Sequence, residues 1–254
     1  ITDTAYQDAK AMPLTLVDYG SGNSMTLYMQ EAIRQWAEQR WGKETLYSKG
    51  LIIKTTLNMT MQKDAEKAFA PIVEQLRTTQ GPQLNGGLVC LHAQTGAIRA
   101  CIGGINFQES QYNRALQATR QIGSSFKPIL YAAGLCAGIE MDSVRVDEPL
   151  SLPQGSGPAW TPKNWTNYFE GPMTLARALT SSNNMISIKL LLELGIERVI
   201  KFARLFGITQ ELKPYPSLAL GTAELTVAHN AAAFNVFANN GYYVPPFFIE
   251  WVKD

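Results

Sequence analysis

The 254-residue sequence contains little cysteine and little histidine. Cys90, Cys101 and Cys136 are too few and too scattered for a disulfide framework and form no CxxC pair, so we expect all three to be small apolar core residues. His92 and His229 are the only histidines, and no acidic cluster accompanies them at ligand spacing. We therefore expect no metal site and no cofactor, and any catalysis must use a base other than histidine.

The chain also has little net charge. Its 22 basic residues nearly balance its 21 acidic ones and leave a formal net charge of +1. Such a chain has no long-range field to attract nucleic acid, which makes a nucleic-acid-binding function unfavourable. No stretch approaches the roughly 20 apolar residues of a membrane span, and the start lacks the regions of a signal peptide. Both ends read as the interior of a longer chain, so a membrane anchor is expected only upstream of Ile1.

What remains is the composition of an ordinary globular protein, 46% hydrophobic and 17% charged. The order of strand and helix patterns predicts an α+β domain or a sheet with helices packed on it. Helical spacing and capping residues predict helices over residues 24–40 with a stop at Gly42, 58–78 bent or interrupted at Pro71, 128–135, 174–194, 196–206 and 225–238. Strands are predicted over 51–57, 87–91 with 97–102 as a hairpin, and 242–252, and an extended excursion forming a cleft wall over 146–171.

The sharpest local feature is the stretch Gly123-Ser124-Ser125-Phe126-Lys127. A Ser and a Lys three residues apart lie on one face of a helical turn, where the amine can act as the base for the hydroxyl. Burial would favour the neutral amine by lowering its pKa, and Gly123 would permit a tight approach at the helix start. By itself S-x-x-K more often means a solvated Lys with a capping Ser, but the apolar helix that follows favours a buried amine.

A second feature is a run of five polar residues, 180–184, inside an otherwise apolar helical pattern. Ser182 and Asn184 form an S-x-N in which the hydroxyl can relay a proton and the amide can hold Lys127 and substrate. The alternative is a helix N-cap, for which Ser and Asn are equally suited. The residues alone leave both interpretations open.

S-x-x-K followed by S-x-N resembles two parts of the three-part signature of penicillin-binding proteins and class A β-lactamases. Further stretches resemble, in the same order, the transpeptidase domain of class A penicillin-binding proteins, and they are Gln111–Ala115, Arg120–Ser124, Pro128–Leu135, Thr161–Trp165, Ala219–Thr226 and Phe237–Gly241. The opening Ile1–Tyr6 resembles the exit from the glycosyltransferase domain of that family, and Gly50–Leu57 resembles its linking strand. The resemblance spans nearly the whole chain.

The resemblance implies an α+β fold of the penicillin-binding protein and β-lactamase type, with helices packed on a mainly antiparallel sheet. It also implies a serine D,D-transpeptidase that cross-links peptidoglycan stem peptides. It makes Ser124 the nucleophile, Lys127 its general base, and Ser182 with Asn184 the proton relay and substrate clamp, with Gly123 and Ser125 in substrate binding. Expected partners are stem peptides and β-lactams, at the extracytoplasmic face of the bacterial inner membrane. It also implies a linker over residues 1–84 and a transpeptidase domain over 85–254.

The third part of the signature, K-T-G, does not follow Asn184 anywhere in residues 185–254. Lys54-Thr55-Thr56 precedes the nucleophile and belongs to the linking strand, so it is not the missing part. We expect the fold to be incomplete at its C-terminal end, with a sheet edge unpaired, and a K-T-G strand in a longer reading frame after Asp254. Two alternatives remain, which are a β-lactamase or carboxypeptidase relative and a catalytically incomplete module that binds penicillin or peptidoglycan.

Overall fold

The computed structural model describes residues 2–4, 7, 26–155 and 157–253. Its α-helices and short 3₁₀ turns are α2 (Leu27–Ser48), α3 (Met59–Gln80), η1 (Gly123–Phe126), α4 (Lys127–Cys136), α5 (Leu175–Thr180), α6 (Asn184–Leu194), α7 (Ile196–Leu205), η2 (Pro216–Leu220) and α8 (Val227–Ala238). Its strands are β1 (Ile52–Thr55), β2 (Leu88–Leu91), β3 (Ile98–Ile102), β4 (Arg120–Gln121), β5 (Val144–Asp147), β6 (Leu152–Gln154), β7 (Gly157–Trp160), β8 (Gly171–Thr174), β9 (Glu224–Leu225) and β10 (Ile249–Lys253).

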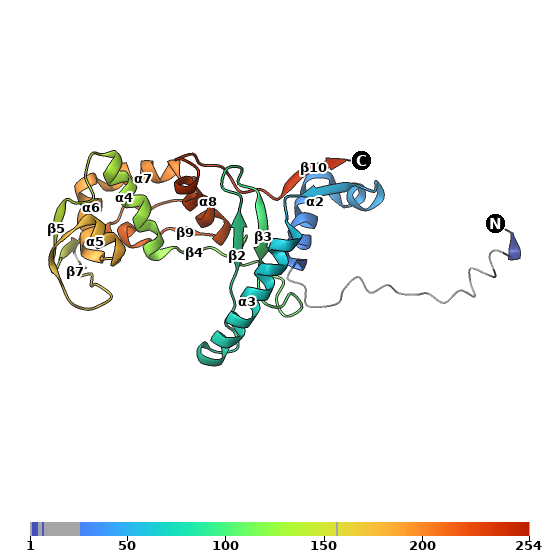
Figure 1. The fold of residues 1–254 in the computed structure, drawn as a ribbon, viewed down its shortest axis with the longest axis horizontal. Helices are drawn as coiled ribbons and strands as arrows, with labels where there is room; N and C mark the ends of the chain where they lie inside the picture. Colours follow the sequence, from blue (N-terminus) through green and yellow to red (C-terminus); the bar gives the residue numbers. More distant parts are fainter. Residues whose placement is uncertain (1, 5–6, 8–25, 156, 254) are drawn as a thin grey trace.

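The molecule is elongated, with the β2–β3 hairpin near its middle (Figure 1). On one side of the hairpin lie α4 to α8 and the strands between them, and on the other lie α2, α3 and the β1–β10 pair. Helix α8 packs on β2, while α2 and α3 pack on β3. The α+β prediction is confirmed, because helices pack on antiparallel strand pairs, as α2, α3 and α8 do on β2–β3.

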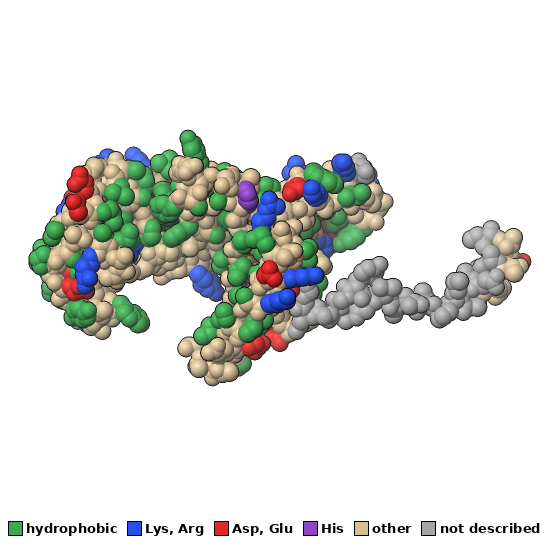
Figure 2. Space-filling view, viewed as in Figure 1, with side chains coloured by type: hydrophobic (Ala, Val, Ile, Leu, Met, Phe, Trp, Pro, Cys, Tyr) green, Lys and Arg blue, Asp and Glu red, His purple; other side chains and the backbone are tan. Residues whose placement is uncertain are grey.

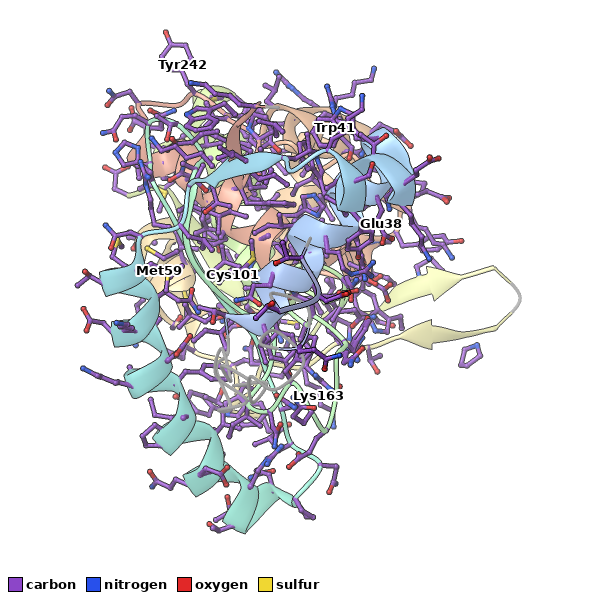
Figure 3. The ribbon with its side chains drawn as sticks, turned by 90° about the vertical axis from the view of Figure 1, so that its right-hand side faces the viewer. Glu38, Trp41, Met59, Cys101, Lys163 and Tyr242 are labelled. Atoms are coloured by element: carbon purple, nitrogen blue, oxygen red, sulfur yellow. The ribbon has the colours of Figure 1, made fainter. Side chains whose placement is uncertain are left out.

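The strands form antiparallel pairs rather than one continuous sheet. Within the described residues the pairs are β1–β10, β2–β3, β4–β9, β5–β8 and β6–β7, each of two strands. The sequence predicted an unpaired sheet edge. In each of these pairs both outer edges lack a further strand among the residues described. The β6–β7 hairpin projects from the body of the molecule, as the pale yellow arrows show (Figure 3).

The main core lies under α4 and α6 and positions the site. Phe126, Ile129, Leu130, Ile186 and Leu190 are completely buried in it. Helix α4 packs against α5, α6, α7 and η2, so its residues near the start are fixed by several neighbours at once. The predicted burial of the 128–135 helix is thereby confirmed.

Several predicted boundaries of helices and strands were wrong. The 174–194 helix divides into α5 and α6, because polar residues interrupt it. Most of the 242–252 strand is absent, since its Pro245–Pro246 pair has no N–H groups for a ladder. Phe247 forms an isolated bridge with Ala97, and the strand itself is limited to Ile249–Lys253. Helix α2 leaves helical geometry at Gly42, as expected, but resumes to Ser48.

Other predictions on the N-terminal side have mixed outcomes. Helix α3 runs continuously through Pro71 after a cap by Asn58, so it bears out the start of the 58–78 prediction but not an interruption. Ser24, the expected helix start, and three of the six residues of the opening stretch (1, 5 and 6) lie outside the described residues.

The cysteine prediction was correct for one residue and wrong for another. Cys101 is fully buried, Cys90 is half-buried, and Cys136 is exposed. Cys136 is the last residue of α4, where the helix leaves the core for a surface turn at Gly138. Apolar surroundings in the sequence therefore did not place its side chain inside.

Candidate functional site

The S-x-x-K stretch forms a 3₁₀ turn that leads directly into α4. Residues Gly123–Phe126 make the turn η1, and Lys127 begins the helix, with its backbone N–H donating to the carbonyl oxygen of Ser124. In a 3₁₀ turn, side chains three residues apart lie one above the other. Ser124 is exposed whereas Lys127 is only 1% exposed, so the hydroxyl faces solvent above a buried amine.

The turn is held from behind by the loop that follows η2. The backbone N–H of Ile122 donates to Ala223 O at 2.9 Å, and that of Gly123 donates to Gly221 O at 3.0 Å. Gly221 has a φ of +77°, and a Cβ built on it would lie 1.8 Å from the carbonyl oxygen of Gly123. Only glycine fits there, so the sequence at 221 fixes how closely this loop supports the turn.

Lys127 reaches three oxygen atoms of the S-x-N segment. Its Nζ lies 2.6 Å from Ser182 O, 3.0 Å from Ser182 Oγ and 2.7 Å from Asn184 Oδ1. Burial lowers the pKa of Lys127 to about 8. At neutral pH roughly a tenth of such an amine is uncharged, which is on the order of 10² times more than for an ordinary lysine.

The S-x-N segment forms the break between α5 and α6. Ser182 has a φ of +53°, a rare backbone conformation for a residue other than glycine. It directs both its carbonyl and its hydroxyl to Lys127, while Asn183 caps α6 by accepting the N–H of Ile186 at 2.9 Å. Asn183 is therefore the helix cap, while Ser182 and Asn184 contact the lysine, and the relay and clamp roles of these two residues stay a prediction.

An open cavity of about 800 Å³ lies above these residues. Ser124, Ser182 and Asn184 line it on one side, and the wall opposite is made by residues of the 161–170 loop, namely Lys163, Asn164, Trp165 and Asn167. Trp165 is 95% exposed at the rim. The predicted excursion over 146–171 therefore contributes a cavity wall, and Lys163, labelled in Figure 3, marks its position.

Two residues expected in substrate binding are used mainly in the turn itself. Ser125 donates its hydroxyl to Ile122 O at 2.5 Å. Gly123 has a φ of +55° and no heavy atom within 4 Å of the place where a Cβ would lie. Of the two, Gly123 leaves open space beside the nucleophile position, whereas the Ser125 hydroxyl is already bonded.

The sequence interpretation gave no role to Asp147 and no individual role to Asn164. Both are buried, and Asn164 joins Asp147 to the backbone of Asn184. Thr161–Trp165 was noted only as a stretch of resemblance. The signal that could have found the pair is an Asn inside a polar loop beside a Trp and a Lys, together with an Asp that ends a strand, but their contact depends on the tertiary fold.

Metal-binding clusters, membrane-spanning helices and surface charge also characterise the described part of the chain. Across the described residues no group of three or more His, Cys, Asp or Glu side chains is arranged to hold a metal ion. No helix in the described part of the chain is both long enough and apolar enough to cross a membrane. On the face shown in Figure 2, acidic and basic side chains are interspersed among apolar and neutral ones.

Lys127 thus lies buried beneath the exposed Ser124 and bonds Ser182, in the break between α5 and α6, and Asn184, the first residue of α6. The family model described as the penicillin binding protein transpeptidase domain matches residues 86–254. The chain therefore belongs to the penicillin-binding protein transpeptidase family.

The chain is similar in sequence to penicillin-binding protein 1A from two organisms. Penicillin-binding protein 1A of Neisseria meningitidis is 46% identical over 179 residues, covering 69% of this chain and 22% of the relative. Penicillin-binding protein 1A of Pseudomonas aeruginosa is 39% identical over 233 residues, covering 90% of this chain and 28% of the relative. The expected resemblance to the class A proteins is confirmed, and the chain spans about a quarter of the length of these curated relatives.

Solved structures agree with this fold. The crystal structure of penicillin-binding protein 1A from Haemophilus influenzae matches with a TM-score of 0.82 and 26% identity, covering 100% of this chain and 52% of that one. PonA1 from Mycobacterium tuberculosis in complex with penicillin V matches with a TM-score of 0.75 and 28% identity, covering 91% and 63%. The predicted transpeptidase fold is confirmed.

Proposed function

We propose that this chain carries the serine acyl-transfer site of a D,D-transpeptidase that cross-links peptidoglycan stem peptides. The observation that carries the proposal is the buried Lys127, held at 2.6–3.0 Å by Ser182 and Asn184 beneath a cavity that Ser124 also lines. Ser124 is the nucleophile and Lys127 its general base. Membership of the transpeptidase family and the similarity to penicillin-binding protein 1A support this assignment.

The hydrogen-bond pattern explains how Lys127 can act while neutral. Ser182 O and Asn184 Oδ1 can only accept, so they take the two N–H groups of a neutral amine. This leaves the lone pair for the proton of Ser124, and the third N–H of the charged amine that results donates to Ser182 Oγ at 3.0 Å. Ser182 is therefore suited to exchange a proton with Lys127, which makes it the relay to a leaving group.

In the first step Lys127 takes the proton of the Ser124 hydroxyl as Oγ attacks the carbonyl carbon of the penultimate D-Ala. The C–N bond then breaks, and the departing D-Ala amine takes the proton of Ser182 while Lys127 returns one to Ser182. In the second step an amine of a neighbouring stem peptide attacks the ester, loses a proton to the same groups, and frees Ser124. We assign the open space at Gly123 and the turn at Ser125 to the approach of the donor peptide.

β-Lactams acylate the same Ser124 in this proposal. Support comes from the similarity to PonA1, whose structure was solved in complex with penicillin V. The proposal further places the site on the extracytoplasmic face of the bacterial inner membrane, as the resemblance to class A penicillin-binding proteins implies. Residues 1–84 serve as the linker to a glycosyltransferase domain, and residues 85–254 as the transpeptidase part.

A second candidate is a module that binds or is acylated by penicillin but does not complete cross-linking. The observation in its favour is that residues 185–254 contain no K-T-G. The discriminating experiment exposes the chain to a penicillin, locates any adduct by mass spectrometry and then supplies a stem-peptide donor with an acceptor amine. Acylation of Ser124 by the stem peptide with release of D-Ala supports the transpeptidase, a penicillin adduct without acylation by the stem peptide supports the module, and no adduct on Ser124 contradicts both.

A further inference from the structure

A buried carboxylate lies behind the S-x-N segment. Asp147, the last residue of β5, is 1% exposed, and its oxygens accept from Asn164 Nδ2 at 2.9 and 3.0 Å and from the backbone N–H of Glu170 at 2.9 Å. All three of these hydrogen bonds come from neutral amides. A buried carboxylate without hydrogen-bond donors would be strongly destabilising. The position of the Asp147 carboxylate therefore fixes the positions of the amide groups that donate to it.

Asp147 determines which way the Asn164 amide points. Asn164 Nδ2 also donates to Tyr168 O at 3.1 Å. Because a carboxylate and a carbonyl can only accept, the NH₂ side of Asn164 must face them, and its oxygen must face the other way. There Asn164 Oδ1 accepts the backbone N–H of Asn184 at 3.0 Å.

Asn184 is held by the same loop through its side chain. It is the first residue of α6, where backbone N–H groups have no partner inside the helix, and Asn164 supplies one. Its Nδ2 donates to Lys163 O at 2.7 Å. This again leaves the oxygen as the free end of the amide, and Oδ1 accepts from Lys127 Nζ at 2.7 Å.

We propose that Asp147 and Asn164 are positioning residues, which fix the direction in which Asn184 presents its carboxamide oxygen to Lys127. Donor and acceptor roles alternate without a break from the Asp147 carboxylate through Asn164 to Asn184 and Lys127. The pair touches Lys127 only through Asn184. The effect of the Asp147–Asn164 pair on catalysis rests on the proposed function, whereas the orientation that the pair imposes on Asn184 does not.

The test reverses the polarity of the pair. In Asp147→Asn the N–H of Glu170 keeps the oxygen of the new amide at the Oδ2 position, where it can still accept from Asn164 Nδ2, but an NH₂ group replaces Oδ1 at 2.9 Å from that same Nδ2. Asn164→Asp sets two carboxylates against each other. The exchange variant Asp147→Asn/Asn164→Asp restores a donor facing an acceptor and keeps an oxygen toward the N–H of Asn184, while it loses the bond to Tyr168 and one of the two contacts within the pair.

The matched control is Arg145→Gln. Arg145 lies two residues before Asp147 on β5 and pairs with Glu193 of α6 at 2.7 Å, so its loss loosens the same two elements without touching Asn164. Two quantities are measured in every variant, namely the rate of acylation by a penicillin and the titration midpoint of the Lys127 side chain by ¹³C NMR. The titration needs no turnover, and Lys127→Met assigns its signal.

We expect each single variant to acylate about 10- to 100-fold more slowly. We also expect its Lys127 midpoint to fall, because the amine loses an oxygen that favours its charged form. The exchange variant should recover most of the parent's acylation rate and most of its Lys127 midpoint. Arg145→Gln should match the parent in both measurements. A folded single variant with the parent's rate and midpoint contradicts the proposal.

The exchange variant decides the matter if the single variants do not fold. It then must fold and titrate near the parent, and an unfolded or differently titrating exchange variant contradicts the proposal. A parent chain that is never acylated contradicts the proposed function instead. In that case the Lys127 midpoints still show whether Asp147 and Asn164 position Asn184.

Discussion

Lys127 Nζ lies 2.7 Å from Asn184 Oδ1, although 57 residues separate the two in sequence. Lys127 begins α4 and Asn184 begins α6, and the two helices pack against each other so that their starting residues meet. A buried amine is thereby surrounded by oxygens at the foot of an open cavity. The predictions below depend on this meeting.

We predict that a penicillin acylates Ser124 and not Ser125. Ser124 is exposed in the cavity and has Lys127 three positions later, whereas the Ser125 hydroxyl already donates to Ile122 O at 2.5 Å. Peptide mapping by mass spectrometry should find the adduct on Ser124. Ser125→Ala should keep it, and an adduct that survives Ser124→Ala would show that the nucleophile is another residue.

We predict that Lys127→Ala abolishes acylation and leaves the fold largely intact. The amine contacts oxygens of the site rather than filling the apolar core, and removing it also removes the cost of burying a charge. Circular dichroism and thermal melts compare the folds. Acylation at the parent rate would mean that Lys127 is not the base, while global unfolding would mean that its role is in packing.

We predict that the acylation rate rises with pH through about 8, the lowered pKa of Lys127, and levels off above it. The sign follows because a general base acts in its uncharged form, which predominates above its pKa. At pH 7 the rate should be roughly a tenth of the plateau. A rate constant that does not change between pH 6 and 9 would contradict a titrating amine base.

We predict that Gly221→Ala destabilises the chain and slows acylation. Its Cβ would lie 1.8 Å from Gly123 O and would push the loop away from the turn that carries Ser124. Gly138→Ala is the matched control, because Gly138 also has a positive φ but nothing within 4 Å of its Cβ position. The control should cost about 1–3 kcal/mol in chemical denaturation and keep the parent acylation rate.

Equal acylation by the Gly221→Ala and Gly138→Ala variants would contradict this reading of the loop. Both variants lose stability through backbone strain, and only Gly221→Ala adds the clash with Gly123.

We predict little or no transpeptidation by the 254-residue chain. Residues 185–254 lack the K-T-G whose strand supplies an oxyanion donor, and losing one such donor costs ~10²–10³ in rate. Chromatography of a reaction with a stem-peptide donor and an acceptor amine measures the product. Robust cross-linking would show that the active site lies elsewhere.

The local chemistry could be predicted from the sequence. Serine and lysine three residues apart, followed by an apolar helix, favoured a buried amine. The polar break at 180–184 left a helix cap and a partner for Lys127 both open, and only the family resemblance favoured the partner. The order of the family-like stretches identified the fold. The α+β class and the main helices followed from the spacing of apolar residues.

The sequence alone determined which groups are present and which lie within one turn of each other, because short-range spacing is set by helix geometry. The tertiary structure decided what meets across long separations. It placed Asp147 and Asn164 behind Asn184, turned Cys136 outward at the end of α4, and reduced the last strand to Ile249–Lys253. These outcomes depend on how helices and strands pack, and the local pattern of residues does not contain that information.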